Sequence, residues 1–210
     1  MRRLLALGLA GVLALAISAP VAAGANVSNS SGSATVAEAF WYADSIDGYS
    51  FGYLSAWQET GSSTASLNYW TESGAWVDCT PGDPNDDFYG FQGSYSSGYG
   101  MGDLSVGKGY GSASASGTID LYGALIDDCA GTYEENFDTG IPVSLVMTAT
   151  GPKIMYRGTG SFHVPSQFNS HSSYSSTTRE AAGTVTIGSN DPIATAGAIG
   201  KVSWRDHYNG

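Results

Sequence analysis

The sequence has few charged residues, and basic residues are especially scarce. Only 13% of its 210 residues are charged, with 8 Lys and Arg against 19 Asp and Glu, so the formal net charge is −11. A chain this poor in Lys, Glu and Arg has few of the residues that favour surface helices. Because so few cations can neutralise only a few phosphates, we expect no nucleic-acid partner.

The sequence also lacks an apolar run that is long enough to cross a bilayer. The run Leu4–Ile17 is shorter than the roughly 20 residues that a membrane-spanning helix needs. It follows Arg2 and Arg3 and precedes small residues at 23–25, which is the order of a secretory signal peptide. We therefore predict a signal peptide over residues 1–25 and a secreted, extracellular bacterial protein without a membrane anchor after cleavage. Loss of Arg2 and Arg3 would take the formal charge from −11 to −13.

Cysteine is almost absent, because Cys79 and Cys129 are the only two. In an exported protein such a pair is typical of an intramolecular disulfide, which we predict between them. A redox pair or a thiolate metal site is the alternative, although there is no Cys-x-x-Cys spacing and no cluster of histidines.

Acidic residues gather on both sides of these cysteines. The first is flanked by Asp78, Asp83, Asp86 and Asp87, and the second by Asp127, Asp128, Glu134, Glu135 and Asp138. A disulfide would bring both acidic segments to one end of the fold. Oxygen ligands on loops suit Ca²⁺, so we predict a candidate calcium site from Asp83, Asn85, Asp87, Asp127 and Asp128. The alternative is a solvated pair of acidic loops that keeps the protein soluble, and no other cofactor is expected.

Gly, Ser, Thr and aromatic residues are abundant, with 29 Gly and 12% aromatics. Apolar and polar residues alternate with a period of two, which predicts strands, in the segments 49–57, 65–69, 113–121, 143–148, 154–164 and 184–187. We expect one all-β domain over 35–210, preceded by a flexible lead at 26–34. The fold predicted is an antiparallel β-sandwich of about 8–11 short strands, with a closed or partly open β-barrel as the alternative. We expect the glycine-rich stretch 93–117 to form strands rather than a linker.

Residues Thr150–Lys153 are predicted to form the clearest hairpin turn. The stretch Val143–Gly188 contains this turn, a Ser-rich run to Thr178 and the segment Arg179–Val185. It resembles uncharacterised secreted all-β proteins of actinobacteria. The resemblance implies secretion and β structure, and it carries over no activity and no catalytic residue.

The sequence contains five Trp, which are many for a chain of this length and point to a role of these side chains in function. We predict that Trp57, Trp70 and Trp76 form an aromatic platform, because flat rings stack on sugar rings; the alternative is that they pack in the core. The predicted function is therefore non-enzymatic binding of a surface, a carbohydrate or another cell-envelope component.

The sequence also allows two other functions. One is a secreted hydrolase of a cell-wall or environmental polysaccharide, for which Glu38 is a candidate carboxylate. Glu38 is either buried with a raised pKa or placed at a strand bulge, and a structural role is the favoured alternative to catalysis. The other is a structural or self-associating envelope protein, which would present a long unpaired strand edge.

Overall fold

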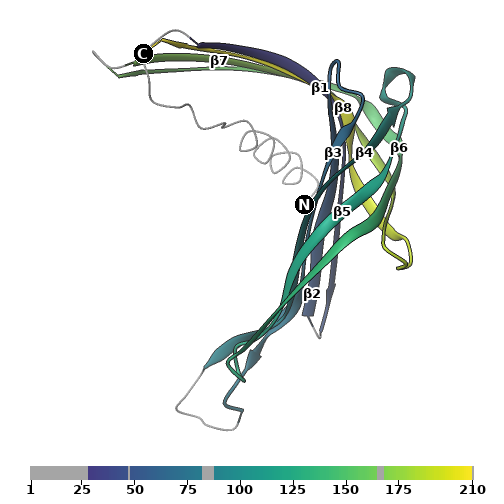
Figure 1. Ribbon diagram of the computed structural model, residues 1–210, viewed down its shortest axis with the longest axis vertical. Coiled ribbons are helices and arrows are strands. Elements are labelled where there is room, and N and C mark those ends of the chain that lie inside the picture. Colours follow the sequence, from purple (N-terminus) through teal and green to yellow (C-terminus); the bar gives the residue numbers. More distant parts are fainter. Residues whose placement is uncertain (1–27, 47, 82–87, 165–167, 210) are drawn as a thin grey trace.

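The computed structural model describes residues 28–46, 48–81, 88–164 and 168–209, and Figure 1 shows their arrangement. Eight antiparallel strands follow one another: β1 (Ser28–Ser45), β2 (Gly48–Glu59), β3 (Ala65–Asp78), β4 (Tyr89–Val106), β5 (Ser112–Asp127), β6 (Thr132–Val164), β7 (Phe168–Ile187) and β8 (Ile193–Asn209). A short 3₁₀ turn, Lys108–Tyr110, connects β4 to β5.

Each strand pairs with the next, and β8 pairs with β1, so that a single sheet closes in a ring. The predicted all-β antiparallel fold is confirmed. Of the two arrangements considered, the closed single sheet is the alternative one, because the eight strands form one continuous ladder rather than two packed sheets. Among the described residues, no helix is long and apolar enough to span a membrane.

The ring is uneven, because only the middle parts of the strands close it. Pairing of β1 with β8 ends at Phe40, and pairing of β6 with β7 begins at Val143, so one end of the molecule is an open six-stranded sheet of β1–β6, here called the lower sheet. At the other end β1, β6, β7 and β8 extend beyond β2 and β5 as a four-stranded arm. In Figure 1 the arm runs to the upper left, away from the lower sheet.

The hydrophobic core fills the inside of the ring. Its largest fully buried side chains include Leu54, Leu67, Ile119, Leu145 and Ile199, and Trp41 stacks on Tyr69 with ring centroids 6.0 Å apart. The glycine-rich stretch forms β4 and the start of β5, as predicted. Gly100 shows why glycine is needed there, because a Cβ atom would lie 1.9 Å from the carbonyl oxygen of Thr118. The missing side chains therefore let the strands approach one another closely.

β6 runs straight through Thr150–Lys153, so the predicted hairpin turn was wrong. The register with β7 instead shifts between Ala149 and Lys153. Pro152 has no N–H for the ladder, and a bulge accommodates it without reversing the chain. At this point β6 leaves the ring and enters the arm.

The expected N-terminal lead also has regular structure where it is described. Residues 28–34 form the first part of β1 and pair with β8 in the arm. The predicted signal peptide, residues 1–25, lies outside the described residues.

Candidate functional site

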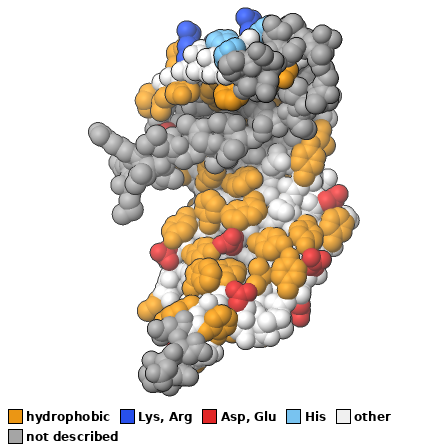
Figure 2. Space-filling view, turned by 90° about the vertical axis from the view of Figure 1, so that its left-hand side faces the viewer, with side chains coloured by type: hydrophobic (Ala, Val, Ile, Leu, Met, Phe, Trp, Pro, Cys, Tyr) orange, Lys and Arg blue, Asp and Glu red, His pale blue; other side chains and the backbone are white. Residues whose placement is uncertain are grey.

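The outward side of the lower sheet carries a dense set of aromatic side chains. Successive residues of a strand point to opposite faces, and the register aligns the outward residues of neighbouring strands. We call this surface the aromatic face, and it consists of Tyr42, Tyr49, Phe51, Tyr53, Trp70, Trp76, Tyr89, Phe91, Tyr95, Tyr99, Tyr122, Tyr133 and Phe137. Figure 2 shows hydrophobic side chains spread over the lower part of the molecule, with acidic side chains among them.

The rings of the aromatic face contact one another in rows across the strands. Tyr53 pairs with Trp70, and their rings stack with centroids 6.4 Å apart. Phe51 meets Trp70 edge to face at 5.4 Å, and Trp76 lies 5.9 Å from Phe91. Such cross-strand contacts hold the rings in place, so the surface is arranged before any ligand binds.

Carboxylates are held among these rings by tyrosine hydroxyls. Tyr122 donates a hydrogen bond of 2.7 Å to Glu135, and Tyr49 donates one to Glu72. The hydroxyls of Tyr95 and Tyr133 are 2.7 Å apart. The hydrogen bond to Glu135, followed by those with Tyr133 and Tyr95, raises the pKa of Tyr122, because the carboxylate favours the neutral phenol. The face thus combines apolar rings with fixed hydrogen-bond acceptors.

The three tryptophans predicted as a platform all lie on the outer face but at different heights. Trp76 is 65% exposed near the far end of β3, and Trp70 lies at the centre of the aromatic rows, half-buried. Trp57 lies at the closed ring, where it packs beside Trp204 over the buried side chain of Val36. Tyrosine and phenylalanine side chains supply most of the exposed surface around Trp70 and Trp76. Among the residues of the aromatic face, the period-two alternation that predicted strands covers only Tyr49, Phe51 and Tyr53.

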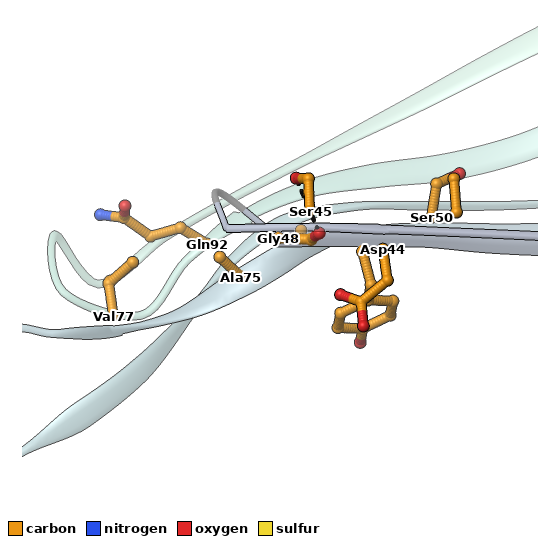
Figure 3. A pocket seen from close by; sticks show the side chains of 10 residues that line it. Asp44, Ser45, Gly48, Ser50, Ala75, Val77 and Gln92 are labelled. Carbon is orange, nitrogen blue, oxygen red and sulfur yellow. Dashed lines mark hydrogen bonds between the residues drawn. The ribbon is translucent and has the colours of Figure 1, made fainter.

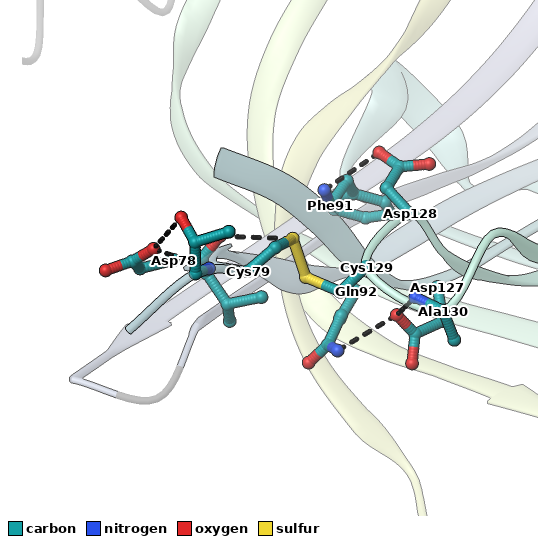
Figure 4. Close-up of a disulfide and its surroundings, with 10 residues drawn as sticks. Asp78, Cys79, Phe91, Gln92, Asp127, Asp128, Cys129 and Ala130 are labelled. Carbon is teal, nitrogen blue, oxygen red and sulfur yellow. Dashed lines mark hydrogen bonds between the residues drawn. A yellow bond between two sulfur atoms is a disulfide. The ribbon is translucent and has the colours of Figure 1, made fainter. Parts of the chain in front are cut away.

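The predicted disulfide joins Cys79 to Cys129 with Cα atoms 5.1 Å apart, and it ties the end of β3 to the segment after β5 (Figure 4). The neighbouring carboxylates accept structural hydrogen bonds. Asp128 accepts from the backbone N–H of Phe91, and Asp127 accepts from Ala130 and from Gln92. The bond from the Ala130 N–H, then that from Gln92, lowers the pKa of Asp127.

The candidate calcium site is only partly within the described residues. Asp127 and Asp128 are described, whereas Asp83, Asn85 and Asp87 lie outside the described range. Among the described residues, no group of three His, Cys, Asp or Glu side chains is placed to hold a metal ion. The calcium site therefore stays a prediction.

The lower sheet also has two shallow hollows. One has a volume of about 440 Å³ and is lined by the β1–β2 hairpin and by parts of β3 and β4. In Figure 3, Ser45 and Ser50 point to one side of the strands and Asp44 to the other. The second hollow has a volume of about 560 Å³ and contains Asp127 and Glu134 in its lining.

Glu38, the candidate acid of a hydrolase, lies at the closed ring on the outer side of β1 and lines neither hollow. Its carboxyl is largely buried, and this desolvation raises its pKa to about 7. Across Ala198 of β8, the residue that follows on the same face is Glu180. The two carboxylates are therefore two strands apart on this face, Glu38 buried in large part and Glu180 exposed.

A second charged surface was missed by the sequence reasoning. The inner wall of the ring continues onto one side of the arm, and we call that side the basic face. It carries five of the six Lys and Arg residues that follow the predicted signal peptide, together with all three His: Lys153, Arg157, Arg179, Lys201, Arg205, His163, His171 and His207. Figure 2 shows blue and pale blue side chains at the top of the view. The signal in the sequence was that all these residues occupy odd-numbered positions, spread over the three strands β6, β7 and β8.

Comparison with known proteins adds no assignment. The sequence matches no family model, and it matches neither a curated protein nor a solved structure. The function must therefore be inferred from the surfaces described above.

Proposed function

We propose that the protein is exported and that it binds a polysaccharide on the aromatic face without acting as an enzyme. The observation that carries this proposal is the row of contacting rings around Trp70, together with two carboxylates that tyrosines hold on the same face. Glu72 lies on the strand of Trp70, and Glu135 lies three strands away on β6. An exposed apolar patch of this extent marks an interaction site on a soluble protein. Planar rings stack on the faces of sugar rings, and the carboxylates accept hydrogen bonds from sugar hydroxyls.

The shape of the surface supports a polymeric ligand. The lower sheet is an open, extended sheet, and its exposed rings are spread over β1 to β6 rather than gathered in one pocket. Tyr and Trp side chains supply contact area with little loss of conformational entropy, so many weak contacts add up along a chain of sugars. A small ligand would reach only a few of these rings.

The direct test is a pull-down of the purified protein on chitin, cellulose and peptidoglycan. We expect binding to at least one of them, with a marked loss of affinity for Tyr42→Ala, whose side chain is 64% exposed on the aromatic face. Tyr156→Ala is the matched control, because Tyr156 is 54% exposed on the arm. Absence of binding to all three polymers, or equal effects of the two variants, would reject the proposal.

Self-association is a second candidate function, and unpaired strand edges favour it. Among the described residues, Thr132–Gly140 of β6 pair only with β5 or lie at its bulge, and Lys153–Ser161 have strand partners only on β7. Unpaired N–H and C=O groups along an exposed strand can pair with another chain. Sedimentation velocity over a range of concentrations tests this candidate, and a monomer at every concentration would remove it.

A further inference from the structure

The basic side chains and histidines of the basic face are arranged in regular rows. These rows lie on the arm, away from the aromatic face. In the arm, every second residue of β7 marks a row of four side chains on this face, which its partners on β6 and β8 and the facing residue of β1 complete. From the ring outward, five successive rows carry Lys153 with Arg179, then Lys201, then Arg157, then Arg205, and then His171 with His207. Each row therefore contains at least one basic side chain or histidine.

The spacing of these rows is set by strand geometry. A strand rises about 3.3 Å per residue, so rows two residues apart repeat every 6.6 Å or so. An extended phosphodiester chain with three carbons between phosphates has six backbone bonds per repeat. Six extended backbone bonds span about 7 Å, as two residues of an extended peptide do. One phosphate of such a chain can therefore face each row.

The rest of the face suits the same ligand. Most remaining positions in these five rows are Ser and Thr, whose hydroxyls can donate hydrogen bonds to phosphate oxygens; the exceptions are Met155, Ile199, Ala37 and Asn29. In the part of these strands that forms the arm, the acidic residues Glu180 and Asp206 point to the side opposite to the basic face. Four of the five Lys and Arg side chains are exposed, and Arg179 is half-buried. Like charges at this density repel one another until an anion neutralises them.

The aromatic residues of the arm distinguish between two kinds of phosphate polymer. Tyr156, Tyr174 and Trp204 lie on the side opposite to the basic face, because they occupy the even-numbered positions of the strands. Proteins that bind single-stranded nucleic acids place aromatic rings among their basic residues, so that the bases can stack. A backbone of phosphates without bases fits the basic face better.

We propose that the basic face binds a linear polyol-phosphate polymer, which lies along the arm with one phosphate at each row. The interaction is largely electrostatic, because cations of Lys and Arg replace the counterions of the polymer. The site is separate from the aromatic face. A negative result for one proposal therefore leaves the other proposal unaffected.

The experiment measures binding of the full chain to synthetic poly(glycerol phosphate) by calorimetry at several salt concentrations. We expect affinity to fall roughly tenfold or more between 50 and 200 mM salt. The triple variant Arg157→Gln, Lys201→Gln, Arg205→Gln should weaken binding by roughly tenfold or more and make it less dependent on salt. These three side chains are exposed, so the variant should fold, and its thermal midpoint checks this.

Matched controls distinguish binding at the basic face from an effect of the protein's net charge. Arg157→Gln and Lys108→Gln each remove one positive charge, but Lys108 lies in the turn between β4 and β5, outside the arm. Only the first should weaken binding, and Arg157→Lys should retain most of it. Tyr42→Ala should leave it unchanged.

Four results would overturn the proposal. They are no binding at 50 mM salt, equal binding by the triple variant, and tighter binding of single-stranded oligothymidylate than of poly(glycerol phosphate). The fourth is self-association that the triple variant abolishes while the polymer does not bind, which would make a second copy of this chain the partner.

Discussion

The phenol of Tyr122 on β5 donates a hydrogen bond of 2.7 Å to a carboxylate oxygen of Glu135 on β6. This contact orients a negative charge among aromatic rings and raises the pKa of Tyr122. The position of the Glu135 carboxylate and the pKa of Tyr122 therefore depend on the same hydrogen bond.

The variant Glu135→Gln should lower the pKa of Tyr122, because a neutral amide no longer stabilises the protonated phenol. The measurement is an NMR titration of ¹³C-labelled tyrosine rings, in which Tyr122→Phe identifies the signal. A titration that is unchanged in Glu135→Gln would contradict the hydrogen-bond arrangement. The same variant should weaken binding to whichever polysaccharide the protein retains in the pull-down.

Loss of the Cys79–Cys129 disulfide should destabilise the protein. The bond has a sequence separation of 50 residues, for which chain entropy gives up to about 4 kcal/mol in free energy of unfolding. Urea denaturation with and without reductant measures the difference. Cys79→Ser, Cys129→Ser is the control, because its unfolding midpoint should not respond to reductant. A wild-type midpoint that is insensitive to complete reduction would disagree with this expectation.

Glu38 should make the stability depend on pH. Its pKa is about 7 in the folded protein against the ordinary value of 4.5, so between these values the folded chain holds a proton that the unfolded chain has released. The free energy of unfolding should therefore fall as pH rises through this window, by up to about 3 kcal/mol.

The variant Glu38→Gln removes this titration, so it should gain stability over the wild type as pH rises from 4.5 to 7.5. Chemical denaturation at several pH values gives the two curves. Glu180→Gln, on the same face but exposed, is the matched control. If the difference in free energy of unfolding between wild type and Glu38→Gln stayed constant across this range, burial would not raise the pKa of Glu38.

Close strand approach makes specific glycines irreplaceable. In Gly183→Ala the new Cβ would lie 1.9 Å from the carbonyl oxygen of Val146, so backbone must move. We expect a loss of about 3 kcal/mol or more in free energy of unfolding, at the upper end of overpacking effects. Gly111→Ala is the control, since its Cβ would meet no atom nearer than 3.5 Å and its φ of −75° suits alanine. Equal stabilities of the two variants would contradict the close packing.

The sequence was informative where side-chain alternation alone decides the structure. Tyr53 and Trp57, or Leu145 and Met147, repeat every second or fourth residue, and the strands they predicted are present. The pair Cys79 and Cys129 is also joined as predicted. Each of these inferences needs only local pattern or simple pairing.

The closure of the sheet could not be predicted in this way. A ring or a sandwich depends on whether the first and last strands meet, for example at Ala37 opposite Ile199, and no local pattern encodes this contact. Gly151 and Pro152 were misleading for a related reason, because the same two residues suit a turn or a bulge. The basic face was missed because Arg157 and Arg205 become neighbours on one surface only through β7.

One strand, β6, spans the whole length of the molecule. It carries Glu134 and Asp138 at its lower end and Lys153 and Arg157 at its upper end, with the buried Leu145 between them. The protein is therefore an electric dipole along this strand, although its net charge is negative. Beside any negatively charged surface or polymer such a molecule would turn its arm toward that surface and its acidic end away from it. Orientation would thus come from the charge distribution, before any specific contact is made.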